Sequence, residues 1–277
     1  MIRWALPYHK REPKSDRSVR QTLENVPMAK TTSRLNDSDR YFAKLPVWEV
    51  RLRLWHWANL FVFLLLILSY LLFDNHKELG LSKPTTELFQ KLHVYLGYLF
   101  TFLVLGRLHL AFRGQTFSRF KDMDPRRPGD SFARVLKEET LHHLHPKTDA
   151  NGLPVPDSDP GHNRLGRFLY LPLLTILLPV QVLTGLLWAS FKWGFLPIPV
   201  LHSLSPSIAK PATWVVSNIH AAGLYALLGF LVLHLGGLIK YELTFSSDLF
   251  SSMIHGKKIL TREATRNYEK ETGRTID

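Results

Sequence analysis

Four long apolar blocks alternate with polar, basic segments along this chain of 277 residues. The blocks cover about Leu54–Phe73, Leu92–Phe112, Phe168–Phe191 and Val215–Ile239. Each block reaches the roughly 20 apolar residues that a helix needs to cross the hydrocarbon core of a bilayer. The pattern therefore predicts an all-α integral membrane protein, a four-helix bundle whose helices all span the membrane.

The positive charges between the blocks predict the topology. The segments 1–53, 113–167 and 240–277 together carry 29 Lys and Arg residues, whereas 74–91 and 192–213 together carry five. By the positive-inside rule, the richer segments lie in the cytoplasm. We therefore expect both termini to be cytoplasmic, and the formal charge of +12 then reflects membrane topology, not nucleic-acid binding.

The composition also divides the chain into a membrane domain and two tails. Residues 1–45 are polar and basic without an apolar core, which predicts a disordered cytoplasmic tail. The bundle domain is expected over 46–260, and residues 261–277 are expected to form a cytoplasmic C-terminal tail. The chain contains no cysteine, so a bound redox metal needs histidine or methionine ligands.

The fourth block carries two histidines, His220 and His234, separated by 14 residues. On a helix this spacing places both imidazoles on one face, about 21 Å apart along the axis. A glycine follows each histidine by three residues, at Gly223 and Gly237, and leaves room beside it for a flat, bulky group. Histidines inside a membrane can also be plain contacts between helices, but a same-face pair at two depths favours two haems stacked across the bilayer.

Two further histidines supply partners at matching depths. His93 is expected at the outer start of the second helix, beside His220, and His56 near the cytoplasmic end of the first helix, beside His234. Two bis-histidine sites follow. Bis-imidazole ligation fills both axial positions of a haem iron, which suits electron transfer and leaves no open position for oxygen.

Two arginines share the predicted cofactor faces. Arg53 precedes His56 by three residues, and Arg107 follows His93 by 14. Both are expected at cytoplasmic depth, where a guanidinium can pair with a haem propionate. The alternative for each is an arginine that extends to the lipid headgroups. His109 lies about 160° from His93 around the helix and is not expected to be a ligand.

The connections between the helices carry weaker signals. The loop 113–167 is expected to contain a short amphipathic helix around Ser131–His142, and prolines at 172 and 179 predict a kink in the third helix. The proline-rich segment 192–213 is expected to cover the outer face, and Met253–Lys258 to rest on the membrane surface. A histidine tract in the long loop is more often solvated than metal-binding; its members are His142, His143 and His145.

Several motifs together carry a resemblance to a known family. They are VWEVRLRLWHW (47–57), HVYLG (93–97), GRLHLAFRG (106–114), SRF (118–120), GHNRLGR (161–167), TG (184–185), IHAAGLYALLGFLVLHL (219–235) and SMIHGKK (252–258). Over about 46–260 the chain resembles the bacterial cytochrome b561 family, which includes the b-type cytochrome subunits of membrane-bound nickel–iron hydrogenases. The resemblance implies two haem b groups ligated by His56, His93, His220 and His234.

The resemblance also implies a function and a location. We expect a di-haem cytochrome of the bacterial inner membrane that passes electrons between the quinone pool and a periplasmic redox partner. Some hydrogenase subunits carry an additional histidine just before the fourth-helix ligand, where this chain has Ser217, Asn218 and Ile219. The partner is therefore left open among a hydrogenase, a multihaem cytochrome c and a molybdenum reductase. The alternatives are a stand-alone haem oxidoreductase acting on superoxide and a small transporter whose histidines relay protons or bind metal.

Overall fold

The computed structural model describes residues 43–125, 130–146, 148, 152–156, 158–245 and 248–275. Phe42–Asp277 forms one compact unit, to which the following description applies. The disordered tail predicted over 1–45 lies outside the described residues, apart from its last three positions.

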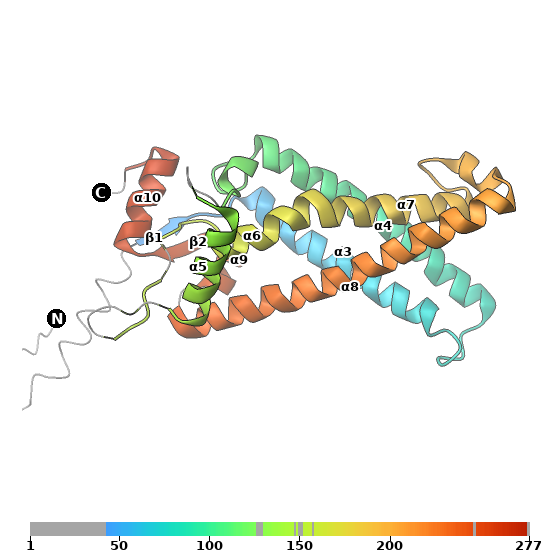
Figure 1. Ribbon diagram of the computed structural model, residues 1–277, viewed down its shortest axis with the longest axis horizontal. Coiled ribbons are helices and arrows are strands. Elements are labelled where there is room, and N and C mark those ends of the chain that lie inside the picture. Colours follow the sequence, from blue (N-terminus) through green and yellow to red (C-terminus); the bar gives the residue numbers. More distant parts are fainter. Residues whose placement is uncertain are drawn as a thin grey trace, which may run out of the picture. The chain divides into compact units, whose positions relative to one another are not determined.

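Within the described residues, four helical segments are long and apolar enough to cross a membrane, which confirms the predicted all-α membrane architecture. They are α3 (Val50–Asp74), α4 (Lys83–Arg113), the segment Arg164–Trp193 and α8 (Pro206–Phe245). α3 packs on α4, α7 on α8, and α4 on α7 (Figure 1).

The helices extend beyond the apolar blocks, and the expected start of the second helix was wrong. α4 begins at Lys83, nine residues before the predicted start. Ser82 caps it by accepting a hydrogen bond from the amide of Thr85, and Pro84 occupies the first turn. His93 therefore lies ten residues inside α4 and not at its end. α8 likewise begins at Pro206, inside the segment predicted to cover the outer face.

Two prolines interrupt the third membrane segment, as predicted. α6 (Arg164–Pro172) ends at the first proline, a π-helical turn η3 (Leu173–Leu177) follows, and α7 (Leu178–Trp193) carries Pro179 in its first turn. Proline has no N–H to donate and its ring clashes with the preceding turn, which interrupts the regular α-helical hydrogen bonds. The wider π-helical turn accommodates this interruption. Gly194, in the left-handed conformation, ends α7.

The core of the bundle lies where α4 meets α3, the third segment and α8. It is built from buried aliphatic and aromatic side chains, mainly Val62, Phe100, Val104, Leu174, Leu178 and Leu227. Large apolar side chains elsewhere on the helices point outward, for example Phe102 and Val232, each 71% exposed. Such exposed apolar surface is expected where lipid, not water, surrounds the protein.

A small module covers one end of the bundle and was not predicted. β1 (Ala43–Pro46) pairs antiparallel with β2 (Lys257–Leu260), and α9 (Leu249–His255) and α10 (Arg262–Thr272) flank β2 in sequence. Both connections, α3–α4 and α7–α8, lie at the opposite end (Figure 1). The described ends of the chain are thus on the same side of the bundle. That this side is cytoplasmic stays a prediction.

The module shares a hydrophobic cluster with the membrane helices. Trp48 and Leu52 of the first helix region pack with Leu110 of α4 and with Leu260 and Tyr268 from the C-terminal segment. The Tyr268 hydroxyl donates a hydrogen bond to the carbonyl of Pro46, at 3.1 Å. The predicted C-terminal tail, residues 261–277, therefore contains α10, which packs against this end of the bundle.

Short helices complete the connections. The amphipathic helix expected around Ser131–His142 is present as α5 (Phe132–Leu144). One-turn 3-10 helices lie at η2 (Phe120–Asp122) and η4 (Pro199–Ser203).

Candidate functional site

The structure brings His93 of α4 against His220 of α8. Their ring centroids are 6.4 Å apart and the ring planes are nearly perpendicular, at 87°. Metal–imidazole bonds are about 2 Å long, so two imidazoles on opposite sides of one metal ion have ring centres roughly 6 Å apart. The spacing of this pair, called the outer pair below, therefore fits two axial ligands of one metal.

The Nδ1 atom of each outer histidine is held by neighbouring groups. His93 Nδ1 lies 3.1 Å from the carbonyl oxygen of Leu66 and 3.0 Å from Ser69 Oγ. His220 Nδ1 lies 3.1 Å from the carbonyl oxygen of Gln181 and 3.2 Å from Thr184 Oγ1. A carbonyl only accepts, so Nδ1 carries the proton in both rings and Nε2 keeps the lone pair that binds a metal.

The pair Thr184–Gly185 explains how His220 fits against α7. A Cβ atom at position 185 would lie 2.8 Å from Cε1 of His220 and 3.3 Å from its Nδ1. Only glycine leaves the imidazole room there, while the neighbouring Thr184 offers the hydroxyl beside Nδ1. The TG motif thus packs and orients the ring.

The second pair, called the inner pair below, comes from α3 and α8. His234 lies close enough to His56 for the two imidazoles to interact electrostatically. The buried Nδ1 of His56 has no hydrogen-bond partner among the described residues. Phe230 stacks on His234 with ring centroids 5.8 Å apart and planes 9° apart. The two imidazoles are therefore within electrostatic range of each other, but they lack the hydrogen bonds that hold the outer pair.

The predicted space beside the histidines is present at some glycines and filled at another. Within 4 Å of a Cβ built on Gly97 or Gly237 there is no other atom. At Gly223 the prediction was wrong, because a Cβ there would lie 2.0 Å from Oε1 of Gln181. The side chain of Gln181 fills that space.

Arg107 is fully buried at the inner end of α4. Its Nε donates to the hydroxyl of Tyr170, at 2.5 Å, and its Nη1 donates to the carbonyl of Ser118, at 3.0 Å. The guanidinium also lies over the rings of Trp55 and Tyr170. No carboxylate among the described residues pairs with Arg107. An arginine that merely reached for headgroups would be exposed, so this side chain is held inside the protein.

Arg53 points to the module at the base of the bundle. Its Nη1 donates to the carbonyl of Ile254, and its buried Nε has no partner within the described part of the chain. A Cβ on Gly256 would lie 3.1 Å from the Arg53 guanidinium carbon. Trp57 donates a further hydrogen bond to the carbonyl of Met253, at 3.0 Å. α9 is thus fastened to the first turns of α3, next to His56.

His162 was not among the site residues predicted from the sequence. Its ring stacks on Tyr170, with centroids 5.3 Å apart, and lies 4.7 Å from the ring of Trp48. Burial, with smaller contributions from Arg167, Arg107 and other nearby groups, lowers the pKa of His162 to about 3. The ring is therefore neutral at physiological pH. The only signal in the sequence was its place in the GHNRLGR motif.

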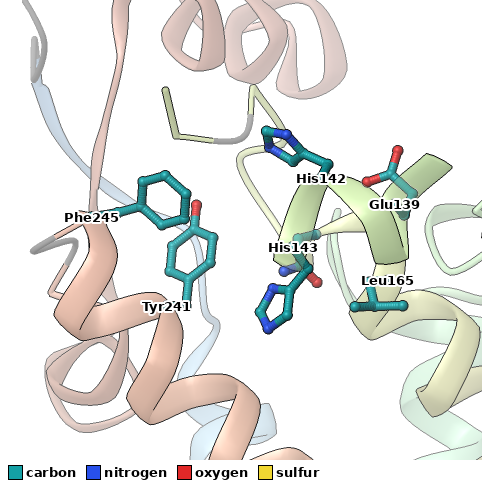
Figure 2. A pocket seen from close by; sticks show the side chains of 7 residues that line it. Glu139, His142, His143, Leu165, Tyr241 and Phe245 are labelled. Carbon is teal, nitrogen blue, oxygen red and sulfur yellow. The ribbon is translucent and has the colours of Figure 1, made fainter. Parts of the chain in front are cut away.

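The remaining candidates lie away from both pairs. His109 is exposed on α4. Two residues of the histidine tract line a small cavity between α5, α6 and α8 (Figure 2); its lining is Glu139, His142, His143, Asn163, Leu165, Tyr241 and Phe245. Its volume of about 10 Å³ is room for a single water molecule. In the described parts of the chain, no group of three or more His, Cys, Asp or Glu residues is arranged to hold a metal ion.

Comparison with known proteins gives the chain its family. A family model described as prokaryotic cytochrome b561 matches residues 47–256, a range that contains all four membrane segments and both histidine pairs. No curated protein and no solved structure matches the chain. Because the match covers most of its length, the chain belongs to the prokaryotic cytochrome b561 family and is a multi-pass bacterial membrane cytochrome that binds haem b and transfers electrons.

Proposed function

We propose that this protein holds two haem b groups and passes electrons across the inner membrane, between the quinone pool and a periplasmic redox partner. His93 and His220 would hold one haem, and His56 and His234 the other. The observation that carries the proposal is the outer pair. Its two imidazoles are 6.4 Å apart, and their Nδ1 atoms face carbonyl oxygens.

The donor set fits a haem that His93 and His220 would hold. Neutral imidazoles are good ligands, and a hydrogen bond from Nδ1 to a carbonyl fixes the ring and raises the basicity of Nε2. When bound, haem supplies the one-electron redox step. Since two protein imidazoles would hold the iron, the site favours electron transfer over activation of oxygen.

α8 would serve both centres. The 14 residues between His220 and His234 correspond to about 21 Å along one continuous helix. A single rigid element then fixes the distance between the two redox centres, one near each face of the membrane. This arrangement is what transfer across the bilayer requires, and it supports an electron conduit over a proton or metal transporter.

Arg107 and Arg53 would serve the inner centre. Arg53 lies one turn before His56 on α3, Arg107 lies over the ring of the adjacent Trp55, and neither is neutralised by a carboxylate among the described residues. A buried cation such as Arg107 is costly without a counter-ion, Arg53 keeps a buried Nε without a partner among the described residues, and haem brings two propionates. We therefore assign these arginines to the carboxylates of the inner haem, with Tyr170 and Ser118 holding Arg107 in place.

Substituting the histidines one at a time tests the pairing. His93→Ala and His220→Ala should each remove the same haem, and His56→Ala and His234→Ala should each remove the other. Redox titration followed by visible absorption distinguishes the two components in purified protein. His109→Ala is the matched control, since this exposed histidine on α4 should leave both haems in place. Loss of one shared component in His56→Ala and His93→Ala would show that the pairing is wrong.

A further inference from the structure

Gln181 reaches both nitrogens of one proposed haem ligand. Its backbone carbonyl oxygen lies 3.1 Å from Nδ1 of His220, and its side-chain Nε2 lies 3.4 Å from Nε2 of the same ring. Oε1 of Gln181 is buried and has no hydrogen-bond partner among the described residues. A half-buried polar side chain with a buried Oε1 atom thus ends at the metal-binding edge of His220.

Gly223 provides the space for this side chain. A Cβ atom on Gly223 would lie 2.0 Å from Oε1 of Gln181 and 3.2 Å from its Cδ. Any side chain at position 223 would therefore displace the amide. A glycine on α8 and a glutamine on α7 together fix where the amide lies.

The tautomer of His220 determines which end of the amide faces the ring. Nδ1 carries the proton because it faces a carbonyl oxygen, so Nε2 presents a lone pair. The amide NH2 group is a donor and is the end that suits this neighbour, while Oε1 points toward Gly223. The positive end of the amide dipole therefore faces the position where a metal binds Nε2. In a buried site, such a dipole is weakly screened.

We propose that the Gln181 side chain forms part of the outer haem site, where its amide contacts the group bound at His220 and raises the midpoint potential of that centre. The proposal rests on the function proposed above. Reduction lowers the charge of the iron by one, so a positive dipole end beside it stabilises the reduced form. Removal of the amide then lowers the potential of the outer centre and leaves the inner centre unchanged.

Gln181→Leu tests this directly, because leucine keeps most of the volume but not the dipole. The backbone carbonyl of residue 181, which faces His220 Nδ1, is still present in this variant. We expect both haems to be retained, with the outer midpoint potential shifted downward and the electron paramagnetic resonance signal of the outer ferric centre altered. Gly223→Ala should shift the same potential, since it displaces the amide. In the double variant, Gly223→Ala should add no further shift.

Gly229→Ala is the matched control. It lies on the same helix, it is exposed, and a Cβ there meets no atom within 4 Å, so both potentials should stay at their original values. An unchanged outer centre in Gln181→Leu with both haems present would overturn the proposal. So would a Gly223→Ala shift of equal size with and without Gln181, because the glycine would then act by another route.

The experiment distinguishes a failure of the Gln181 proposal from a failure of the proposed function. If Gln181→Leu does not assemble, Gly223→Ala decides the question by itself, since it keeps the glutamine and changes only where its amide lies. An unaltered outer centre in that variant contradicts the proposal. The unsubstituted protein is titrated first: absence of two separate haem components there would refute the proposed function, and hence the premise, before any variant is compared.

Discussion

Arg107 is a charged side chain with no exposed surface. Its hydrogen bonds go to neutral groups, the hydroxyl of Tyr170 and the carbonyl of Ser118. Cation–π contacts with Trp55 and Tyr170 offset part of the desolvation cost, but they do not neutralise the charge. A haem propionate at the inner centre would supply the missing negative charge.

Arg107→Gln should lower the midpoint potential of the inner haem. Loss of the positive charge removes an interaction that favours the reduced state, and the screened effect should be on the order of tens of millivolts. Arg107→Lys keeps the charge and should shift the potential less. Redox titration of both centres measures these changes, and the outer centre should hardly move. Equal inner potentials in all three proteins would leave Arg107 with a purely structural role.

His162 should make the folded protein sensitive to acid. Its pKa is about 3 in the fold and 6.5 for an unperturbed histidine, so between these values the unfolded chain binds a proton that the folded chain does not. The free energy of unfolding therefore falls as the pH drops below about 6.5. The loss from this group between pH 7 and pH 5 should be on the order of 2 kcal/mol.

Thermal unfolding in detergent, measured at several pH values, checks this dependence. His162→Phe keeps an aromatic ring between Trp48 and Tyr170 but cannot be protonated, so its stability should fall less steeply with acid. The neighbouring cations Arg167, Arg107 and Lys258 further disfavour protonation of the ring. Identical pH profiles for the two proteins would mean that His162 is not the responsible group.

α10 shows how a polar segment can belong to the core. It buries Ala264 and Tyr268, four residues apart on one helix face, while most of its other side chains are charged or polar. Asn267 donates to the carbonyl of Ser158 and Tyr268 to that of Pro46. This helix therefore joins two segments distant in sequence at the inner end of the bundle.

Tyr268→Ala should loosen the inner centre before the outer one. Loss of a buried aromatic side chain typically costs about 3–5 kcal/mol, and the ring shares its cluster with Trp48 and Leu52, just before His56. We expect the inner haem to be released at a lower temperature than in the unsubstituted protein, as followed by absorbance. Arg266→Ala, an exposed change on the same helix, should have little effect. Simultaneous release of both haems at the original temperature would contradict this role for α10.

Much of the membrane architecture could be predicted from the sequence, because lipid imposes a strict demand for long apolar helices. The same demand makes an intramembrane histidine conspicuous, so the depth of each histidine in its apolar block was enough to expect His93 beside His220. The helix ends were harder. Hydropathy does not show that α4 already begins at residue 83 or that α8 begins at Pro206. These first turns lie outside the apolar blocks.

Contacts between distant segments account for what the sequence did not predict. β1 and β2 are four residues each and pair across more than 200 positions, so no local pattern marks them. The filling of the space beside Gly223 by Gln181 depends on how α7 lies against α8. His162 resembles any polar loop residue until Trp48 and Tyr170 enclose it.

The orientation of the whole molecule is a prediction from the positive-inside rule and can be tested with reporters. A fluorescent protein fused after residue 277 should fluoresce, because the C-terminus is expected in the cytoplasm. An alkaline phosphatase inserted between α7 and α8 should be active, because that connection is expected in the periplasm. Alkaline phosphatase inserted between α4 and α5 should be inactive, because that connection is expected in the cytoplasm. A reversed set of signals would place the densely basic segments outside, against the positive-inside rule.

The haem content of the purified full-length protein shows whether the two histidine pairs hold two haems. A pyridine haemochrome assay, combined with quantification of the polypeptide and a spectrum of the ferric protein, measures both the number and the spin state of the haems. We expect about two b haems per chain, both low-spin, because two imidazoles would hold each iron. One haem per chain, or a high-spin centre that binds carbon monoxide readily, would contradict it.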